Sequence, residues 1–306
     1  MTRILITGAS GLLGLNLALD ARRAHEVIGV DRSTLAYAPF QVIKADLLEP
    51  EAIPNVLKES KAEAVINCAA LADVDACEAN PDLARLLNIE LPARLADACA
   101  RRKIRLLHIS TDAVFDGQKV GYYIESDRPN PSGVYATTKY EGEKAVIQVN
   151  PNSVVARVNF YGWSLSGKRS LAEFFINNLS NEKNVNGFTD VIFCPMLVNH
   201  LNEILLTMLE RGLHGLYNAV GPQAMTKYQF GIEIARKFGL RESLIAPQSV
   251  DKSDLDAHRS HNLRLSTHKL STELQLTLPD FSTGLSMFYT QAQQGYPQKI
   301  RSYQQK

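Results

Sequence analysis

The sequence of 306 residues predicts an α/β protein with a doubly wound parallel sheet and a smaller mixed C-terminal region. Two observations support this fold class. The first half of the chain alternates short apolar runs with helical patterns, and this rhythm changes after about residue 158. Repeated strand, helix, strand units form parallel sheets with right-handed crossovers and helices on both faces. Continuously apolar strands suit a sheet that is covered on both sides.

The predicted strands are short runs rich in β-branched and other apolar residues. They cover residues 3–7, 26–30, 42–45, 64–68, 105–109 and 153–158. The clearest helix between them spans 81–102, where leucines recur at steps of three or four residues. Farther on, we predict a polar loop at 163–170, helices at 171–179, 198–211 and 226–238, and a strand at 215–220.

These elements suggest two domains. The first comprises residues 1–157, and the chain returns to it around 190–221; the second comprises most of 158–306. A mixed region of this kind usually covers the carboxyl edge of the sheet and supplies substrate contacts. The last residues, 291–306, are rich in Gln with few apolar anchors, so we expect them to fray.

Composition excludes several classes of partner. The net charge is +1, so no basic field is available to bind nucleic acid or an anionic membrane surface. The uncharged stretch 4–19 is too short to span a bilayer. The four cysteines show no CxxC spacing, which favours reduced thiols in the cytoplasm.

Three glycines follow the first predicted strand at intervals of three residues. Gly8 would make the tight turn, Gly11 would let a pyrophosphate approach, and Gly14 would let the helix pack closely. The phosphates would meet free N–H groups at a helix N-terminus. We therefore predict a Rossmann-type turn that binds a nicotinamide dinucleotide through Gly8, Ser10, Gly11, Leu12, Leu13 and Gly14.

The end of the second predicted strand supports the same cofactor. Asp31 lies 23 residues after Gly8, near the offset expected for a carboxylate that binds the ribose hydroxyls. Asp31 favours NAD, whereas Arg32 and Ser33 could hold the 2′-phosphate of NADP, so the choice stays open. After the third strand, Asp46 and Leu47 are candidates for the adenine edge, with a plain helix cap as the alternative for Asp46.

A tyrosine and a lysine form the candidate catalytic pair. Tyr135 and Lys139 are four residues apart, hence on one face of a predicted helix. The ammonium and a nicotinamide charge would lower the pKa of Tyr135, which is near 10 when unperturbed. Thr111 follows the predicted strand 105–109 and would donate a hydrogen bond to a carbonyl oxygen on which charge develops.

These motifs together resemble an extended short-chain dehydrogenase/reductase. Residues 110–117 read Ser-Thr-Asp-Ala-Val-Phe-Asp-Gly and resemble the Ser-Thr-Asp-Tyr-Val-Phe-Asp-Gly signature of dTDP-4-dehydrorhamnose reductases. The resemblance covers nearly the whole chain. It implies reduction of a 4-keto sugar nucleotide by NADH or NADPH, with Thr111, Tyr135 and Lys139 as catalytic residues. It also implies that Cys68, Ala69 and Ala70 lie beside the cofactor.

The departures from the family lie on the substrate side. Ala113 replaces the tyrosine of the signature, residues 190–196 keep only the Asp and Pro of the family's pattern, and residues 259–262 lack a proline. Phe160 stands where the family usually has tryptophan, and could stack on the substrate. Arg157, Arg259 and Arg264 could grip a diphosphate, with a structural ion pair or surface solvation as the alternative.

Other functions remain open from the sequence. The histidines, including His258, His261 and His268, show no zinc spacing, so we expect no metal. A sugar-nucleotide epimerase or dehydratase could use the same scaffold. A non-catalytic, NAD(P)-binding regulatory subunit like that of methionine adenosyltransferase is a further alternative. We leave open whether the protein forms a homodimer.

Overall fold

The computed structural model describes residues 1–33, 35–252 and 260–304. Its centre is a seven-stranded sheet in the order β11-β6-β5-β4-β1-β2-β3, and every neighbouring pair is parallel. The strands are β1 (Arg3–Thr7), β2 (Glu26–Asp31), β3 (Gln41–Lys44), β4 (Ala64–Asn67), β5 (Arg105–Thr111), β6 (Val154–Val158) and β11 (Gly215–Ala219). The predicted doubly wound fold is confirmed.

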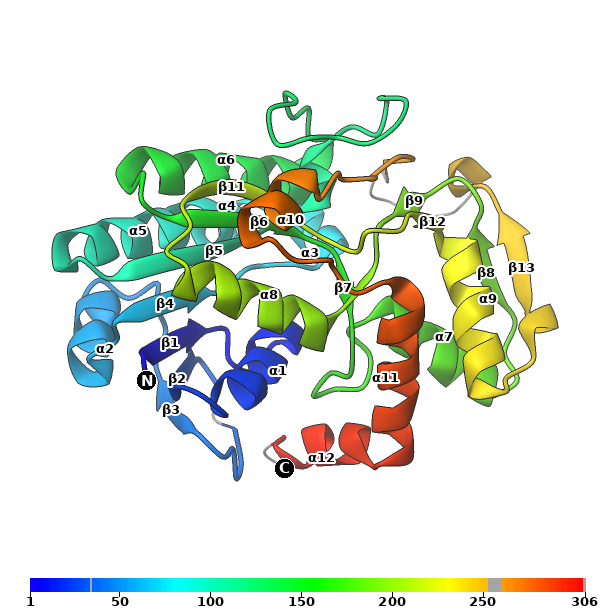
Figure 1. Cartoon of the computed structure of the whole chain (residues 1–306), viewed down its shortest axis with the longest axis horizontal. Coiled ribbons are helices and arrows are strands. Elements are labelled where there is room, and N and C mark those ends of the chain that lie inside the picture. The colour runs from blue at the N-terminus through cyan, green and yellow to red at the C-terminus, as the bar shows by residue number, and fades with distance from the viewer. Residues whose placement is uncertain (34, 253–259, 305–306) are drawn as a thin grey trace.

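Helices cover both faces of this sheet (Figure 1). On one face lie α1 (Leu12–Ala21), α8 (Val198–Glu210) and α10 (His268–Leu274), which share a core with Ile4 and Ile6 of β1. On the other face α2 (Ala52–Ser60) and α5 (Leu91–Arg102) share a core with Leu5, and α6 (Gly133–Val149) packs beside α5. Successive residues of a strand point to opposite faces, so an unbroken apolar run fills both cores.

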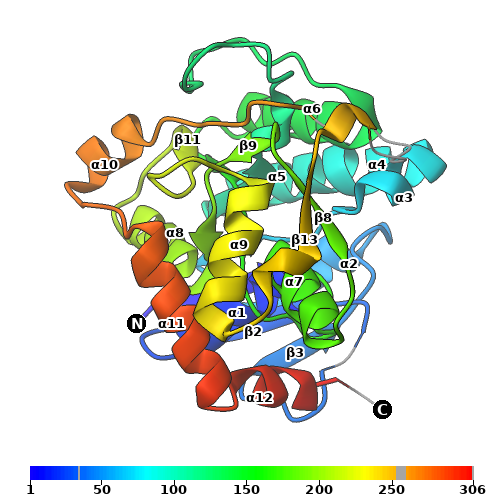
Figure 2. The ribbon, with the colours of Figure 1, turned by 90° about the vertical axis from the view of Figure 1, so that its right-hand side faces the viewer.

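The second region, whose helices and strands face the viewer in Figure 2, is built around aromatic side chains. It contains α7 (Leu171–Ser180), α9 (Lys227–Phe238) and α11 (Phe281–Gln293), with the strand pair β8 (Val185–Phe188) and β13 (Ile245–Gln248). Two shorter pairs are β7 (Phe160–Tyr161) with β10 (Met196–Leu197), and β9 (Ile192–Phe193) with β12 (Met225–Thr226). Capping boxes at Ser170 and Thr226 begin α7 and α9.

The predicted helix at 81–102 is interrupted, which corrects the sequence analysis. The chain forms α3 (Val74–Ala79), α4 (Pro81–Arg85), a π-helical turn (Leu86–Glu90) and then α5. Pro92 lacks an N–H group, so the carbonyl of Asn88 cannot form its usual helical bond. Asn88 is fully buried in this turn. Short 3₁₀ helices occur at Asp112–Val114, Glu242–Leu244 and Val250–Lys252.

The expectation that residues 291–306 fray is wrong for the part the structure describes. Helix α12 (Tyr296–Ser302) packs under α1, where Ile300 and Tyr303 are buried against Leu15. The N–H of Ala36 donates to the carbonyl of Tyr303 at 2.8 Å. A few apolar side chains in contact with a distant helix are enough to hold this end. No helix in the described ranges is both long and apolar enough to cross a membrane.

Candidate functional site

The turn after β1 requires glycine at two positions for different reasons. Gly8 has a φ of +64°, a conformation that L side chains rarely adopt, and a Cβ there would lie 2.9 Å from the backbone nitrogen of Ala69. A Cβ on Gly14 would lie 2.2 Å from the carbonyl oxygen of Gly8. Gly14 therefore lets α1 pack closely against the turn, as predicted.

Gly11 is constrained much less by the protein. A Cβ at Gly11 would meet only the carbonyl oxygen of Gly8, at 3.1 Å. Gly11 is also the N-cap of α1, and no side chain caps the helix there. The first N–H groups of a helix have no partner within it and favour anions. The turn therefore fits the pyrophosphate of a dinucleotide.

Asp31, at the end of β2, is held by the glycine turn. One carboxylate oxygen accepts from both the N–H and the hydroxyl of Ser10, at 2.9 and 2.8 Å, and the other accepts from the N–H of Ser33 at 3.2 Å. The side chain of Ser10 therefore orients Asp31. Arg32 and Ser33 are exposed next to it.

The remaining predicted cofactor residues follow β3 and β4. Asp46 accepts from the N–H of Leu48 at 2.9 Å within a turn, and it does not cap α2, whose N-cap is Glu51. The side chain of Leu47 is buried in the core. Ala69 donates its N–H to the hydroxyl of Thr7 at 3.1 Å, and Cys68 and Ala70 are half-buried at the same carboxyl edge.

The Tyr–Lys pair lies on α6 and faces the end of β5. The strand extends two residues beyond the predicted boundary, so Thr111 is its last residue. The side chain of Thr111 lies close enough to Tyr135 to lower the pKa of its phenol. The ammonium of Lys139 donates to the carbonyl of Ile109 at 2.6 Å, and the lysine side chain is buried. The structure thus brings Thr111, Tyr135 and Lys139 together as predicted.

The electrostatics of the pair differ from the expectation. Burial raises the pKa of Tyr135 to about 12, and the nearby side chain of Thr111 only partly opposes this. Lys139 is not among the groups that shift this pKa, and the lowering expected with a bound nicotinamide stays a prediction. Burial also lowers the pKa of Lys139 to about 8, against the charge of Glu143. A phenol that stays neutral near pH 7 is in the form that can donate a proton.

Asp112 and Asn159 add a polar pair that sequence reasoning missed. Asn159 donates to the carboxylate of Asp112 at 2.6 Å, and the hydroxyl of Thr111 donates to it at 3.2 Å. Burial raises the pKa of Asp112 to about 6, although both hydrogen bonds lower it. The signal for Asn159 was its position directly after a strand of the parallel sheet, where the neighbouring strand ends in Thr111.

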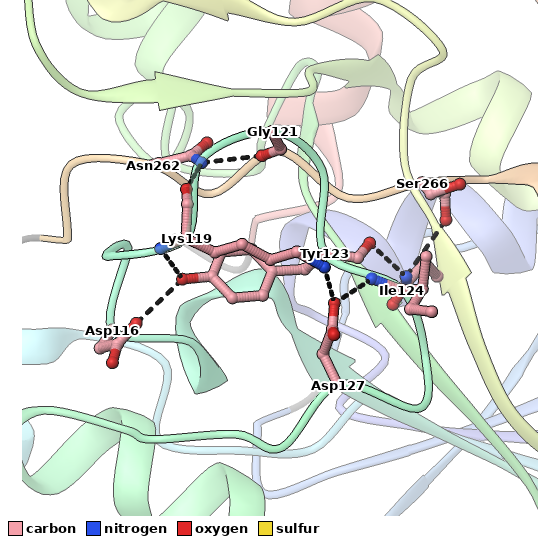
Figure 3. A network of polar contacts seen from close by, with 9 residues as sticks. Asp116, Lys119, Gly121, Tyr123, Ile124, Asp127, Asn262 and Ser266 are labelled. Carbon is pink, nitrogen blue, oxygen red and sulfur yellow. Dashed lines mark hydrogen bonds and ion pairs between the residues drawn. The ribbon is translucent and has the colours of Figure 1, made fainter.

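The loop after Asp112 is fastened to a segment far along the chain (Figure 3). The amide of Asn262 donates to the carbonyls of Lys119 and Gly121, at 2.6 and 2.8 Å. The hydroxyl of Tyr123 donates to Asp116 at 2.9 Å, and its ring stacks on Phe115 with 4.0 Å between centroids. We call residues 115–127 the clamped loop.

The predicted substrate residues lie in different surroundings. Phe160 begins β7 and is half-buried against the core beside the sheet. Arg264 donates to the side-chain oxygen of Asn262 at 2.8 Å and lies over the ring of Tyr122. Arg259 lies outside the described residues.

Arg157 is not available to a diphosphate. It is 1% exposed and forms an ion pair with Glu143 at 2.7 Å, which is the structural alternative that the sequence left open.

In the described ranges, side-chain atoms of Asp190, Asp251 and His261 lie within 4.8 Å of one another. His261 contacts Asp251 at 3.0 Å, and Asp190 accepts from the N–H of Val250.

A helix N-terminus open to phosphate and a Tyr–Lys pair occur here at the same edge of one parallel sheet. This combination places the chain among Rossmann-type dinucleotide-binding proteins. The model of the RmlD substrate binding domain matches residues 1–294, and the chain belongs to this family.

Curated relatives extend along most of the chain. It is 32% identical over 92% of its length to a Haloferax volcanii protein named "Probable low-salt glycan biosynthesis reductase", of which it covers 95%. It is 32% identical over 87% of its length to a dTDP-4-dehydrorhamnose reductase of Mycobacterium tuberculosis, covering 86% of that protein. It is also 30% identical over 88% of its length to methionine adenosyltransferase 2 subunit beta of Rattus norvegicus, covering 82% of that protein.

Solved structures share the fold. A dTDP-4-dehydrorhamnose reductase from Clostridium acetobutylicum superposes with a TM-score of 0.86 at 27% identity, over 95% of this chain and 99% of the other. A reductase of the same name from Bacillus anthracis, solved in complex with NADP, has the same TM-score and coverage at 24% identity.

Proposed function

We propose that the protein is a reductase of a 4-keto sugar nucleotide that uses NADH or NADPH as hydride donor. The placement of Tyr135 and Lys139 on one face of α6, with Lys139 bonded to the strand that ends in Thr111, supports this proposal most strongly. Two of the curated relatives are named as reductases, which favours the same reaction. We also propose that the chain is an extended short-chain dehydrogenase/reductase.

Each catalytic residue has a role that follows from its surroundings. Tyr135, whose pKa is raised to about 12, remains protonated and donates its proton to the carbonyl oxygen of the substrate. Thr111 donates a hydrogen bond to the same oxygen as negative charge develops there. Lys139 is buried beside them and supplies positive charge. The reduced nicotinamide, when bound, supplies the hydride.

The proposed cofactor contacts divide between backbone and side chains. The N–H groups of Gly11, Leu12 and Leu13 would hold the pyrophosphate, and the backbone at 68–70 would flank the nicotinamide half. Asp31, held by Ser10, would accept from the ribose. Exposed Arg32 and Ser33 would tolerate a 2′-phosphate, so both cofactors are consistent with this site. Phe160 and Arg264 are proposed for the substrate.

The test replaces the proton donor alone. Tyr135→Phe keeps the ring and should slow turnover by roughly 10²–10⁴-fold, the usual contribution of a general acid. Turnover is followed by loss of reduced nicotinamide absorbance with dTDP-4-dehydrorhamnose, and cofactor affinity by calorimetry. Tyr140→Phe, on the same helix, is the matched control and should behave as wild type. Unchanged turnover in Tyr135→Phe would sink the proposal.

Dehydration is the competing reaction on this scaffold. Dehydratases of this fold resemble the reductases but carry an acidic pair after the threonine, whereas Ala113 follows Asp112 here. Alanine cannot exchange a proton. Keto product accumulating from dTDP-glucose without net oxidation of the cofactor would favour dehydration. Tight cofactor binding without either reaction, across a panel of nucleotide sugars, would favour the regulatory subunit.

A further inference from the structure

A buried carboxylate lies behind the catalytic pair. Glu143 is 2% exposed, and one of its oxygens accepts from the hydroxyl of Ser110 at 2.6 Å and from Nε of Arg157 at 2.9 Å. The other oxygen accepts from a terminal nitrogen of Arg157 at 2.7 Å. Ser110 and Arg157 are paired in register on β5 and β6. Glu143 therefore links α6 to β5 and β6, and its contact on β5 is Ser110, the residue that precedes Thr111.

Glu143 also shares a helix face with the catalytic pair. Tyr135, Lys139 and Glu143 follow one another at intervals of four residues on α6, so their side chains are stacked along one stripe. Among the charges that act on Lys139, the carboxylate of Glu143 has the largest effect in favour of the ammonium form. Burial opposes it, because Lys139 is only 3% exposed.

The partner of Glu143 is enclosed from the other side as well. The guanidinium of Arg157 lies over the ring of Phe115 at 4.9 Å, and Phe115 in turn stacks on Tyr123. Both residues belong to the clamped loop. The contacts that hold Glu143 are therefore continuous, through Arg157 and Phe115, with those that hold the clamped loop.

We propose that Glu143 is a positioning residue that keeps Lys139 a cation and sets the distance between α6 and Thr111. Its anionic carboxylate offsets the cost of burying the ammonium, and its three hydrogen bonds fix the helix on the strand ends. This inference rests on the proposed function for the role of Lys139, but the charge state of Lys139 can be measured without any substrate.

Two substitutions separate this role from a merely structural one. Glu143→Gln removes the negative charge, so Lys139 should lose its proton at a pH lower by roughly one unit or more. Arg157→Met removes the cation and leaves the carboxylate to Lys139 alone, so the midpoint should rise. Loss of packing alone would move both variants in the same direction. Glu141→Gln, exposed on the same helix, is the control and should leave the midpoint unchanged.

The midpoint is read by nitrogen NMR of isotopically labelled lysine side chains, with the Lys139 signal assigned by its loss in Lys139→Met. Wild type should titrate near pH 8. If Glu143→Gln fails to fold, the double variant with Arg157→Met removes the whole ion pair and should show a smaller fall, because the lost cation offsets part of the effect of the lost anion. A midpoint that does not fall in Glu143→Gln or, where that variant does not fold, in the double variant overturns the inference.

The pH profile of turnover connects this result to function. The alkaline limb in Glu143→Gln should move to lower pH by the same amount as the NMR midpoint, and raising the pH should weaken NADPH binding earlier than in wild type. A shifted midpoint in a protein that reduces no substrate would contradict the proposed function and leave the role of Glu143 supported. An unmoved midpoint in an active reductase would do the reverse.

Discussion

The glycine turn and the clamped loop both follow the carboxyl ends of sheet strands, but their shapes are held by different means. In the turn, backbone geometry decides: Gly14 is required because its Cβ would lie 2.2 Å from the carbonyl of Gly8, only six residues earlier. In the loop, side-chain hydrogen bonds decide, and Asn262 reaches Lys119 across 143 residues of sequence.

We propose that this difference reflects two functions of the site, cofactor binding at the turn and substrate binding beside the loop. A turn specified by nearby glycines keeps the same shape whatever the rest of the chain does, which suits a cofactor common to many substrates. A loop held by distant side chains can change with a few substitutions elsewhere. The departures from the family's pattern at Ala113 and at 190–196 lie outside the glycine turn.

The largest expected effect is on the turn. Gly11→Val should abolish measurable dinucleotide binding, at least about a 100-fold loss, because the side chain would occupy the path of the pyrophosphate. The fold should survive, since a Cβ there meets one backbone oxygen at 3.1 Å. Calorimetry with NADH and NADPH measures the binding, and circular dichroism the fold. Retained affinity would refute the assignment of the turn.

A smaller effect is expected on the clamped loop. Asn262→Ala removes both bonds to Lys119 and Gly121, so the free energy of unfolding should fall by about 1–2 kcal/mol. KM for the sugar nucleotide should rise, whereas the Kd for NADPH should not change. Steady-state kinetics and calorimetry measure the two quantities. An equal loss of affinity for cofactor and for substrate would show that the glycine turn and the clamped loop are not independent.

The last effect appears only as a pH dependence and concerns Asp112, which directly follows Thr111 at the end of β5. Its pKa is raised to about 6 by burial, above the ordinary value of 3.8, so the native chain binds a proton that the unfolded chain releases. This contribution to stability is present below about pH 4 and is lost as the pH rises through 6.

Asp112→Asn removes that dependence. Between pH 4 and pH 7, wild type should therefore lose roughly 2 kcal/mol more of its unfolding free energy than the variant does. Chemical denaturation of both proteins across this range measures the difference. Parallel curves would show that the carboxyl group is ionised throughout, as an exposed aspartate would be.

The sequence by itself determined the sheet, the glycine turn and the positions of Thr111, Tyr135 and Lys139. Each of these depends on patterns within a few residues: apolar runs for strands, glycine spacing for the turn, and a four-residue interval for one helix face. Such local requirements act on the backbone wherever the segment lies in the fold. They can therefore be predicted before any tertiary contact is known.

Tertiary structure alone decided the pKa values, the buried ion pair and the contacts that hold the C-terminal helix. The raised pKa of Tyr135, the ion pair of Arg157 with Glu143 and the docking of Ile300 under α1 each depend on burial by segments far away in sequence. Burial sets the cost of a charge and the gain from an apolar side chain. A single sequence shows which side chains can form such contacts, and only the folded chain shows which ones meet.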